Sequence, residues 1–304
     1  MQNKTILFLL TMCRISKKYK IMLIVALGIL LGVILLFLRP TVLWLNLSKI
    51  SYGTFPFDKN KAILFLNDSL LWDTGTFGSS ISEKYKENIP NKIRFLNSTI
   101  IDFFNEKQQV PFYYSRQFNV GNSFSICNFF FFLLDDREHI EKYQIGCIGM
   151  DVIGKANWVI DFDLEKIHIL PQNKTYETTI PPQLIFEYKQ NKEPKTQLDF
   201  SGFQIENVLI DAGYNSEIVL LKSDIEEINK KHKPVDTLTA ATYGIHSTEP
   251  VISNAYIYDT IMINNICFKN VQIVEGNKRL IGFAFFKRFN KVFLNTKEKD
   301  FYFY

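Results

Sequence analysis

The chain has 304 residues, a formal net charge of +4, 47% hydrophobic residues and 15% aromatic residues. A chain this apolar can bury a large core, which excludes global disorder, and its length allows about two domains. Its 14 glycines and 10 prolines exclude collagen-like sequences, and its 4 cysteines are too few for a disulfide-dense scaffold. The small positive charge gives no support to nucleic-acid binding, so no nucleic-acid partner is expected.

The amino-terminal part predicts a membrane anchor. Residues 21–38 contain no charged residue, and at about 1.5 Å per residue a helix of this length spans about 27 Å, close to the hydrocarbon thickness of a bilayer. The first twenty residues carry basic but no acidic side chains. Because positive charge stays cytoplasmic, we expect residues 1–20 to form a basic cytoplasmic segment, residues 21–38 a single transmembrane helix, and the rest to be exported, into the periplasm if the organism is a bacterium with two membranes.

Two alternatives stay open for this segment, a cleaved signal peptide and a buried helix of a soluble protein. The apolar run ends at Arg39-Pro40 without the small residues of a signal-peptidase site. This ending favours an uncleaved, single-pass anchor that contacts the lipid bilayer.

Three cysteines, Cys127, Cys147 and Cys267, lie in the part expected outside the membrane. We predict that they are thiols of the apolar core, although one disulfide remains open. No His/Cys spacing suggests a metal site, and neither a metal nor an organic cofactor is expected.

Beyond residue 50, short apolar runs rich in β-branched and aromatic residues alternate with polar turns, which predicts an all-β fold. The run of four phenylalanines over residues 129–132 is expected to be a buried strand, since it is far too short to span a membrane. One short helix is predicted from Asp224 to Lys231.

The β-rich part also repeats itself. One apolar run ends in Asp73-Thr74-Gly75 and another in Asp211-Ala212-Gly213, and each is followed downstream by an apolar-apolar-Gly segment that ends at Gly149 or Gly282. The two Asp-to-Gly intervals, 73 to 149 and 211 to 282, differ by only five residues. We therefore predict two similar lobes, residues 50–172 and 180–304, joined by a proline-punctuated linker near residues 171–182.

An Asp at the end of a buried strand, followed by a small residue and Gly, predicts a tight turn. We expect Gly75 and Gly213 to supply both unusual backbone dihedrals and close backbone approach. Two such turns facing each other across a pseudo-twofold axis bring two carboxyls together, and the pair then holds one proton between them. Such a pair can activate water against a peptide bond.

Over residues 60–304 the chain resembles the pepsin and retropepsin superfamily of aspartic proteases, in a tandem single-chain bacterial form. The resemblance implies two pseudo-symmetric all-β lobes with a substrate cleft between them and a catalytic dyad of Asp73 and Asp211. It further implies that Thr74 braces the opposite loop, a role that Ala212 lacks the hydroxyl to share. Thr76 is expected to bond the outer oxygen of Asp73.

The same resemblance predicts a flap over the cleft in each half. Tyr243 and Gly244 are the candidates for the tip of the second flap, and Tyr114, or its neighbour Tyr113, for the aromatic residue of the first.

The leading hypothesis is therefore a membrane-anchored aspartic endopeptidase with peptide or protein substrates and both lobes in one chain. A second hypothesis is a catalytically weak or inactive peptide-binding module, motivated by Ala212. A third is an unrelated membrane-tethered β-rich structural protein, which predicts Asp73 and Asp211 far apart.

Overall fold

A computed structural model describes residues 17–38, 47–95, 97–101, 107–121, 124–135, 145–189, 192–242 and 250–304. The chain divides into two compact units, Met1–Thr41 and Val42–Tyr304. The boundaries predicted within the second unit, at residues 50–172 and 180–304, remain predictions.

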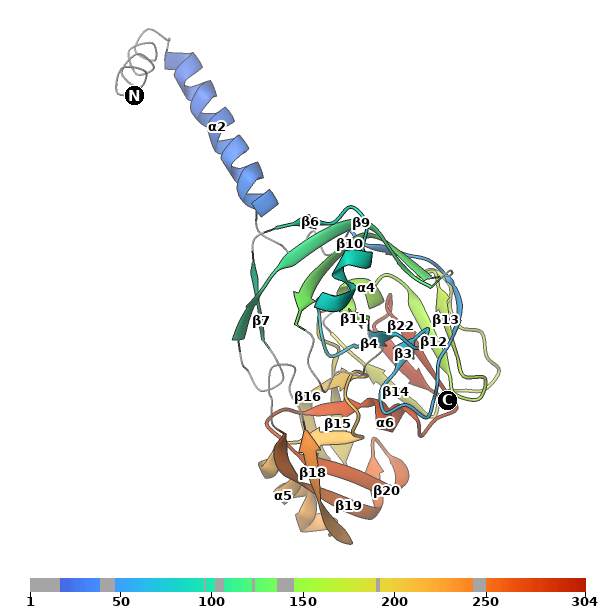
Figure 1. Cartoon of the computed structure of the whole chain (residues 1–304). Coiled ribbons are helices and arrows are strands. Elements are labelled where there is room, and N and C mark those ends of the chain that lie inside the picture. The colour runs from blue at the N-terminus through green and yellow to red at the C-terminus, as the bar shows by residue number, and fades with distance from the viewer. Residues whose placement is uncertain are drawn as a thin grey trace. The chain divides into compact units, whose positions relative to one another are not determined.

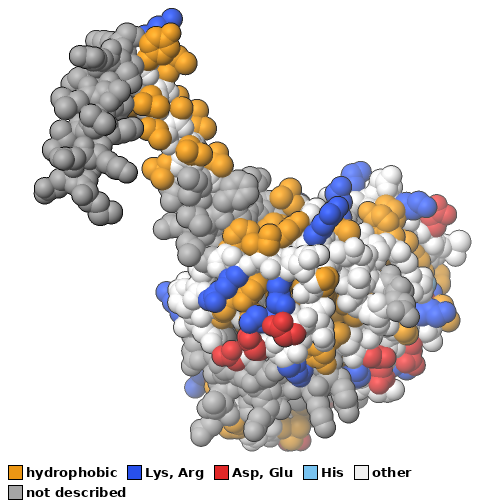
Figure 2. All heavy atoms as spheres, turned by 45° about the horizontal axis from the view of Figure 1, so that its top comes forward, with side chains coloured by type: hydrophobic (Ala, Val, Ile, Leu, Met, Phe, Trp, Pro, Cys, Tyr) orange, Lys and Arg blue, Asp and Glu red, His pale blue; other side chains and the backbone are white. Residues whose placement is uncertain are grey.

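The described part of the first unit is helix α2 (Lys17–Leu38). Hydrophobic side chains cover the described part of this helix in Figure 2, and those between Ile21 and Val33 are largely exposed. Nowhere in the described chain does a helix combine the length and the apolarity needed to cross a membrane. The structure thus gives no support to the transmembrane helix predicted over residues 21–38.

The second unit is mostly β, which confirms the predicted class (Figure 1). Its first sheet has the order β3-β4-β11-β5-β10-β9-β6, with β1 paired to β10. The strands are β1 (Lys49–Ile50), β3 (Phe65–Leu66), β4 (Leu70–Trp72), β5 (Ser80–Ser82), β6 (Ile93–Arg94), β9 (Phe112–Val120), β10 (Phe124–Leu134) and β11 (Gly146–Ile148).

The second sheet repeats this arrangement, with the order β15-β16-β21-β17-β20-β19-β18. Its strands are β15 (Lys195–Phe200), β16 (Phe203–Asp211), β17 (Ile218–Leu220), β18 (Asp236–Thr242), β19 (Val251–Ile263), β20 (Ile266–Glu275) and β21 (Leu280–Gly282). In both sheets the strand that leads into an Asp-x-Gly loop pairs in parallel with the apolar-apolar-Gly strand: Trp72 lies opposite Ile148, and Ile210 opposite Ile281. The sequence repeat is therefore also a repeat of topology.

A third sheet joins strands from both repeats in the order β14-β23-β22-β12-β13-β2. The strands are β2 (Gly53–Pro56), β12 (Asn157–Asp161), β13 (Lys166–Leu170), β14 (Leu184–Glu187), β22 (Lys291–Asn295) and β23 (Asp300–Phe303).

The pair β12–β22 has a register that reveals the symmetry of the unit. Val159 lies opposite Phe293, and Ile160 lies opposite Val292. In the repeat, Val159 corresponds to Val292 and Ile160 to Phe293, so each residue faces the counterpart of its own neighbour. A pseudo-twofold axis consequently passes through the middle of this strand pair.

Helices are few among the described residues of this unit. They are η1 (Glu83–Asn88), α4 (Met150–Ile153), α5 (Lys222–Lys231) and α6 (Phe283–Phe286). Helix α5 confirms the helix predicted from Asp224 to Lys231. Helices α4 and α6 start directly after Gly149 and Gly282, the equivalent glycines of the two halves. A separate two-stranded hairpin consists of β7 (Ser98–Ile101) and β8 (Lys107–Val110).

The phenylalanine run forms part of β10, as predicted. Phe129 and Phe131 are fully buried in the main core, whereas Phe130 packs with Phe112 in a separate cluster. Because β10 lies inside its sheet with apolar contacts on both faces, its sequence does not alternate between polar and apolar residues.

Asn157, at the start of β12, hydrogen-bonds to two segments beside the third sheet, and these bonds offer a test of this architecture. It is fully buried, its Nδ2 donates to the carbonyl of Lys174 at 2.8 Å, and its Oδ1 accepts from the backbone N of Thr296 at 2.9 Å. Asn157→Ala should lower the free energy of unfolding by about 3 kcal/mol, because buried partners lose their hydrogen bonds. Chemical denaturation measures this loss.

The repeat supplies a matched control. Asn290 occupies the same place in the second half but is exposed, so Asn290→Ala should change the free energy of unfolding by less than about 0.5 kcal/mol. Equal losses in the two variants would contradict the assignment.

Candidate active site

The candidate site is built from the two loops that follow β4 and β16. The apolar-apolar-Gly segment of the same half packs against each loop and hydrogen-bonds to it. The backbone N of Met150 donates to the carbonyl of Thr76 at 2.9 Å, and the N of Phe283 donates to the carbonyl of Tyr214 at 2.7 Å. A Cβ at Gly149 would lie 2.8 Å from the Phe77 carbonyl oxygen, and one at Gly282 only 2.1 Å from that of Ser216. Glycine is required at both positions for this packing.

The structure brings the carboxyls of Asp73 and Asp211 together. A Cβ added at Gly75 would lie 2.2 Å from Cγ of Asp211, and one added at Gly213 would lie 2.4 Å from Cγ of Asp73. Each carboxyl therefore lies against the glycine of the opposite loop, and the two side chains share a hydrogen bond. The hypothesis of an unrelated structural protein, which required separated carboxyls, is not supported.

The same glycines correct one expectation about the loops. Neither Gly75 nor Gly213 has a positive φ, so the predicted unusual dihedrals are absent. What these positions require is the missing side chain, because any Cβ would occupy the space of the opposing carboxyl.

Thr74 links the two loops at their base. Its buried Oγ1 donates to the carbonyl of Ile210 at 2.6 Å and accepts from the backbone N of Ala212 at 3.0 Å. Ala212 is fully buried and has no hydroxyl with which to return these bonds. Thr74 of the first loop thus bonds the second loop, and Ala212 cannot form the reciprocal bonds, as the sequence predicted.

Two further loop residues differ from expectation or add to it. The Thr76 hydroxyl does not bond Asp73 but donates to the carbonyl of Gly78 at 3.5 Å, and the backbone N–H of Thr76 approaches Asp73 instead. The hydroxyl of Tyr214 hydrogen-bonds to Oγ1 of Thr242 at the end of β18, at 2.8 Å. The second loop is thereby fastened to the hairpin β18–β19.

Both aspartates titrate above their ordinary range. Burial raises the pKa of Asp73, and hydrogen bonds from Asp211, Gly75, Cys147 and Thr76 partly offset this rise. Burial raises the pKa of Asp211 much further, and the charge of Asp73 adds to the effect. Gly75 N donates to Oδ1 of Asp73 at 2.8 Å, and Gly213 N donates to Oδ1 of Asp211 at 3.0 Å. The arrangement suits one proton shared by the two carboxyls, and the titration belongs to the pair.

Another buried carboxyl, that of Asp151, lies behind the first loop. Its Oδ1 accepts from Oγ of Ser79 at 2.7 Å, and Ser79 Oγ accepts from the N of Gly149 at 3.1 Å. Asp151 Oδ2 is buried without a hydrogen-bond partner, and burial raises the pKa of Asp151 to about 7. The sequence analysis missed this residue; the signal for it was an acidic side chain two positions after Gly149, the glycine that the repeat pairs with Gly282.

The cysteines only partly follow the prediction of three core thiols. Cys147 is buried, but Cys127 and Cys267 are exposed, and all three are free thiols. Sγ of Cys147 lies 3.8 Å from Oδ2 of Asp73, a contact that the sequence analysis also missed.

The predicted flap residues have different outcomes. Tyr243 and Gly244 lie outside the described residues, between β18 and β19, which pair from Asp236 opposite Ile257 to Thr242 opposite Val251. Tyr114 lies in β9 opposite Ile93, and its hydroxyl donates to Oδ1 of Asn128 at 3.1 Å. Its role as the aromatic residue of the first flap stays a prediction. Its neighbour Tyr113 stacks on Phe131.

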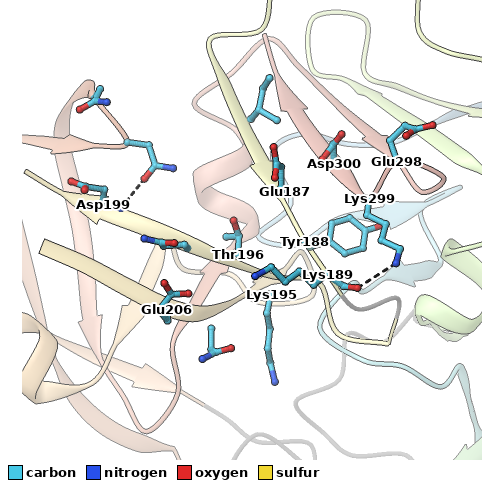
Figure 3. A pocket seen from close by; sticks show the side chains of 15 residues that line it. Glu187, Tyr188, Lys189, Lys195, Thr196, Asp199, Glu206, Glu298, Lys299 and Asp300 are labelled. Atoms are coloured by element: carbon cyan, nitrogen blue, oxygen red, sulfur yellow. Dashed lines mark hydrogen bonds between the residues drawn. The ribbon is translucent and has the colours of Figure 1, made fainter. Parts of the chain in front are cut away.

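A separate cavity of about 890 Å³ contains neither Asp73 nor Asp211 (Figure 3). It is lined mainly by β14, β15, β16 and β23, with acidic side chains outnumbering basic ones, as Figure 3 shows for Glu187, Glu206 and Asp300 beside Lys195. Within the described residues, no group of three or more His, Cys, Asp or Glu side chains is arranged to hold a metal ion.

Comparisons with known proteins give no match: no family model matches the chain, and no curated protein matches it either.

The Thr74 brace predicts a measurable loss of stability. Thr74→Val keeps the size of the side chain but leaves Ile210 O and Ala212 N buried without partners. The free energy of unfolding should fall by about 2–4 kcal/mol. Thr74→Ser retains the hydroxyl and should lose less than half as much. A small loss in Thr74→Val, or a larger loss in Thr74→Ser than in Thr74→Val, would contradict the role of the hydroxyl.

Asp151 predicts a pH dependence of stability. The pKa of Asp151 is about 7 in the folded chain, above the ordinary value of 3.8. Between these two pH values the unfolded chain therefore loses the Asp151 proton while the folded chain keeps it. Stability from this group is present below about pH 4 and is lost as the pH rises towards 7, by up to about 4 kcal/mol.

Asp151→Asn should therefore reduce the fall in unfolding free energy between pH 4 and pH 7.5, measured by denaturation at several pH values. The exposed Asp163→Asn should leave that slope unchanged. A slope in Asp151→Asn equal to that of the wild type would refute the assignment.

Proposed function

We propose that the chain is an aspartic endopeptidase in which Asp73 and Asp211 activate water against a peptide bond. The observation that carries the proposal is the crossed approach of the two carboxyls, each against the glycine of the opposite loop and joined by a hydrogen bond. The matching strand orders of the two sheets and the pseudo-twofold register of β12–β22 further support a pepsin- or retropepsin-like fold of two lobes with a cleft.

The proposed mechanism divides the work between the two carboxyls. Ionised Asp73 takes a proton from water as the water oxygen bonds to the peptide carbonyl carbon, while Asp211 gives its proton to the carbonyl oxygen. In the second step the C–N bond breaks, the amine takes the proton from Asp73, and a hydroxyl proton returns to Asp211. One peptide bond and one water become a carboxyl and an amine, and the dyad ends as it began.

Substrate recognition would use the extended strands that flank the dyad. Strand β18, which ends the second sheet, provides an edge against which an extended peptide can add by backbone pairing. Leu238 of β18 and Val251 and Ile252 of the neighbouring β19 are exposed apolar side chains beside this edge. The bond from Tyr214 to Thr242 couples this hairpin to the second loop.

The catalytic proposal predicts acid-range peptidase activity that depends on both carboxyls. The full chain, assayed from pH 3 to 7 on a peptide library, should cleave peptides and be inhibited by pepstatin. Asp73→Asn and Asp211→Asn should each lower the rate by about 10²–10⁴-fold, because each removes a proton-transfer group. Asp163→Asn serves as the exposed control and should retain full activity.

A second candidate function, a peptide-binding module without turnover, is favoured by Ala212, which leaves the brace one-sided. Under this alternative the wild type binds peptides but does not cleave them, and Asp73→Asn binds as the wild type does. Cleavage that persists unchanged in both Asp variants would contradict the dyad itself.

We further propose, on the sequence alone, that residues 21–38 anchor the protein in the cell membrane with the amino terminus cytoplasmic. The support is the uncharged run that follows the basic residues of the first twenty. The full chain should remain in the membrane fraction after alkaline carbonate extraction, and Leu30→Arg with Leu31→Arg should release most of it. Complete release of the wild type by carbonate would refute the anchor.

A further inference from the structure

The two halves of the site differ in one contact at the dyad. Cys147 lies in the middle of β11, is 7% exposed, and has its Sγ 3.8 Å from Oδ2 of Asp73. A thiol is a weak hydrogen-bond donor, and this distance is within the range of a sulfur hydrogen bond.

The equivalent position in the second half has no donor. Cys147 lies opposite Leu71 in the pair β4–β11, and Leu280 lies opposite Leu209 in the corresponding pair β16–β21. Leu280 is a fully buried aliphatic side chain. The symmetry of the fold thus sets a thiol beside Asp73 and a hydrocarbon in the corresponding place beside Asp211.

The other donors follow the same asymmetry. Besides its contact with Asp211, Asp73 receives hydrogen bonds from the backbone of Gly75 and Thr76 and from Cys147. In the other half, the backbone N of Gly213 donates to Oδ1 of Asp211 at 3.0 Å, as Gly75 N does to Asp73, and the thiol has no counterpart at Leu280. Donors stabilise a carboxylate over a carboxylic acid, so negative charge is favoured on Asp73.

We propose that Cys147 is a positioning residue that keeps Asp73 ionised and leaves the shared proton of the dyad on Asp211. The inference rests on the proposed function and assigns the two carboxyls their roles within it. Cys147 forms no covalent bond in the reaction. Its S–H donates to Oδ2 of Asp73, while Gly75 N donates to Oδ1 of the same carboxyl.

The charges around the thiol keep it able to donate. Burial raises the pKa of Cys147 well above its ordinary value, and the carboxyls of Asp73, Asp151 and Asp211 add to this rise. The thiol therefore remains protonated throughout the acid-to-neutral range. The positive charge of Lys278 lowers the pKa of Asp211 and partly offsets the effect of burial there.

The direct test is infrared spectroscopy of the S–H stretch, which requires no catalytic turnover. In the full chain with Cys13→Ala, Cys127→Ala and Cys267→Ala, Cys147 is the single thiol. Its S–H band should lie below the frequency of a free thiol at pH 6 and should shift upwards as Asp73 becomes protonated on acidification. Adding Asp73→Asn should abolish the shift. A band at the free-thiol frequency that does not change with pH would overturn the proposal.

The kinetic test compares Cys147→Val with Leu280→Val. Loss of the thiol should raise the acid-limb pKa of kcat/KM by about half a unit, as expected for one weak hydrogen bond, whereas Leu280→Val should leave it in place. Cys147→Ser introduces a stronger donor of similar size and should shift the acid-limb pKa less than Cys147→Val does. It also controls for a loss of folding caused by substitution at this position. Equal shifts in the Cys147 and Leu280 variants would count against a positioning role.

The two measurements separate failure of this inference from failure of the proposed function. An S–H band that titrates in a protein without peptidase activity would support the proton assignment and reject the enzyme. Peptidase activity with an invariant band would retain the enzyme and reject the role of Cys147.

Discussion

The close approach of two carboxyl groups, one from each loop, is the constraint on which the rest of the structure depends. Gly75 and Gly213 leave the space into which the opposing carboxyls fit, and any Cβ there would displace them. Such a pair is costly to bury unless a proton is shared and the loops are held from behind. The packing of Gly149 and Gly282 against the loop carbonyls and the bonds of Thr74 across the interface meet that requirement.

The support behind the loops is organised differently in the two halves. Behind the first loop, Ser79 bonds the buried Asp151. The position equivalent to Ser79 is Glu217, whose Oε1 accepts from Nη2 of Arg288 at 2.6 Å and whose Oε2 accepts from the N of Gln272. The hydrogen-bonded pair Ser79–Asp151 behind the first loop thus corresponds to the ion pair Glu217–Arg288 behind the second loop. The backbone frame is shared, while the side chains that stabilise it are not.

The sequence allowed the all-β class, the repeat, the short helix of α5 and the meeting of Asp73 with Asp211 to be predicted, because each leaves a local pattern at a fixed spacing. It did not allow Tyr114 to be placed in strand β9, since an aromatic residue in a strand and one near a hairpin tip look alike along the chain. The contacts of Cys147 and Asp151 arise only when β11 and α4 pack behind the first loop, more than seventy residues away from Asp73 and Ser79, and no local pattern encodes them.

The pseudo-twofold axis through β12 and β22 has a consequence for the history of the protein. A dimer of identical subunits would have to carry every substitution twice, once on each side of its axis. When both halves lie in one polypeptide, each half can change independently. Thr74 can therefore correspond to Ala212, and Cys147 to Leu280. A built-in preference for the proton on one particular carboxyl is thus available to a chain that holds both halves and not to a dimer of identical subunits.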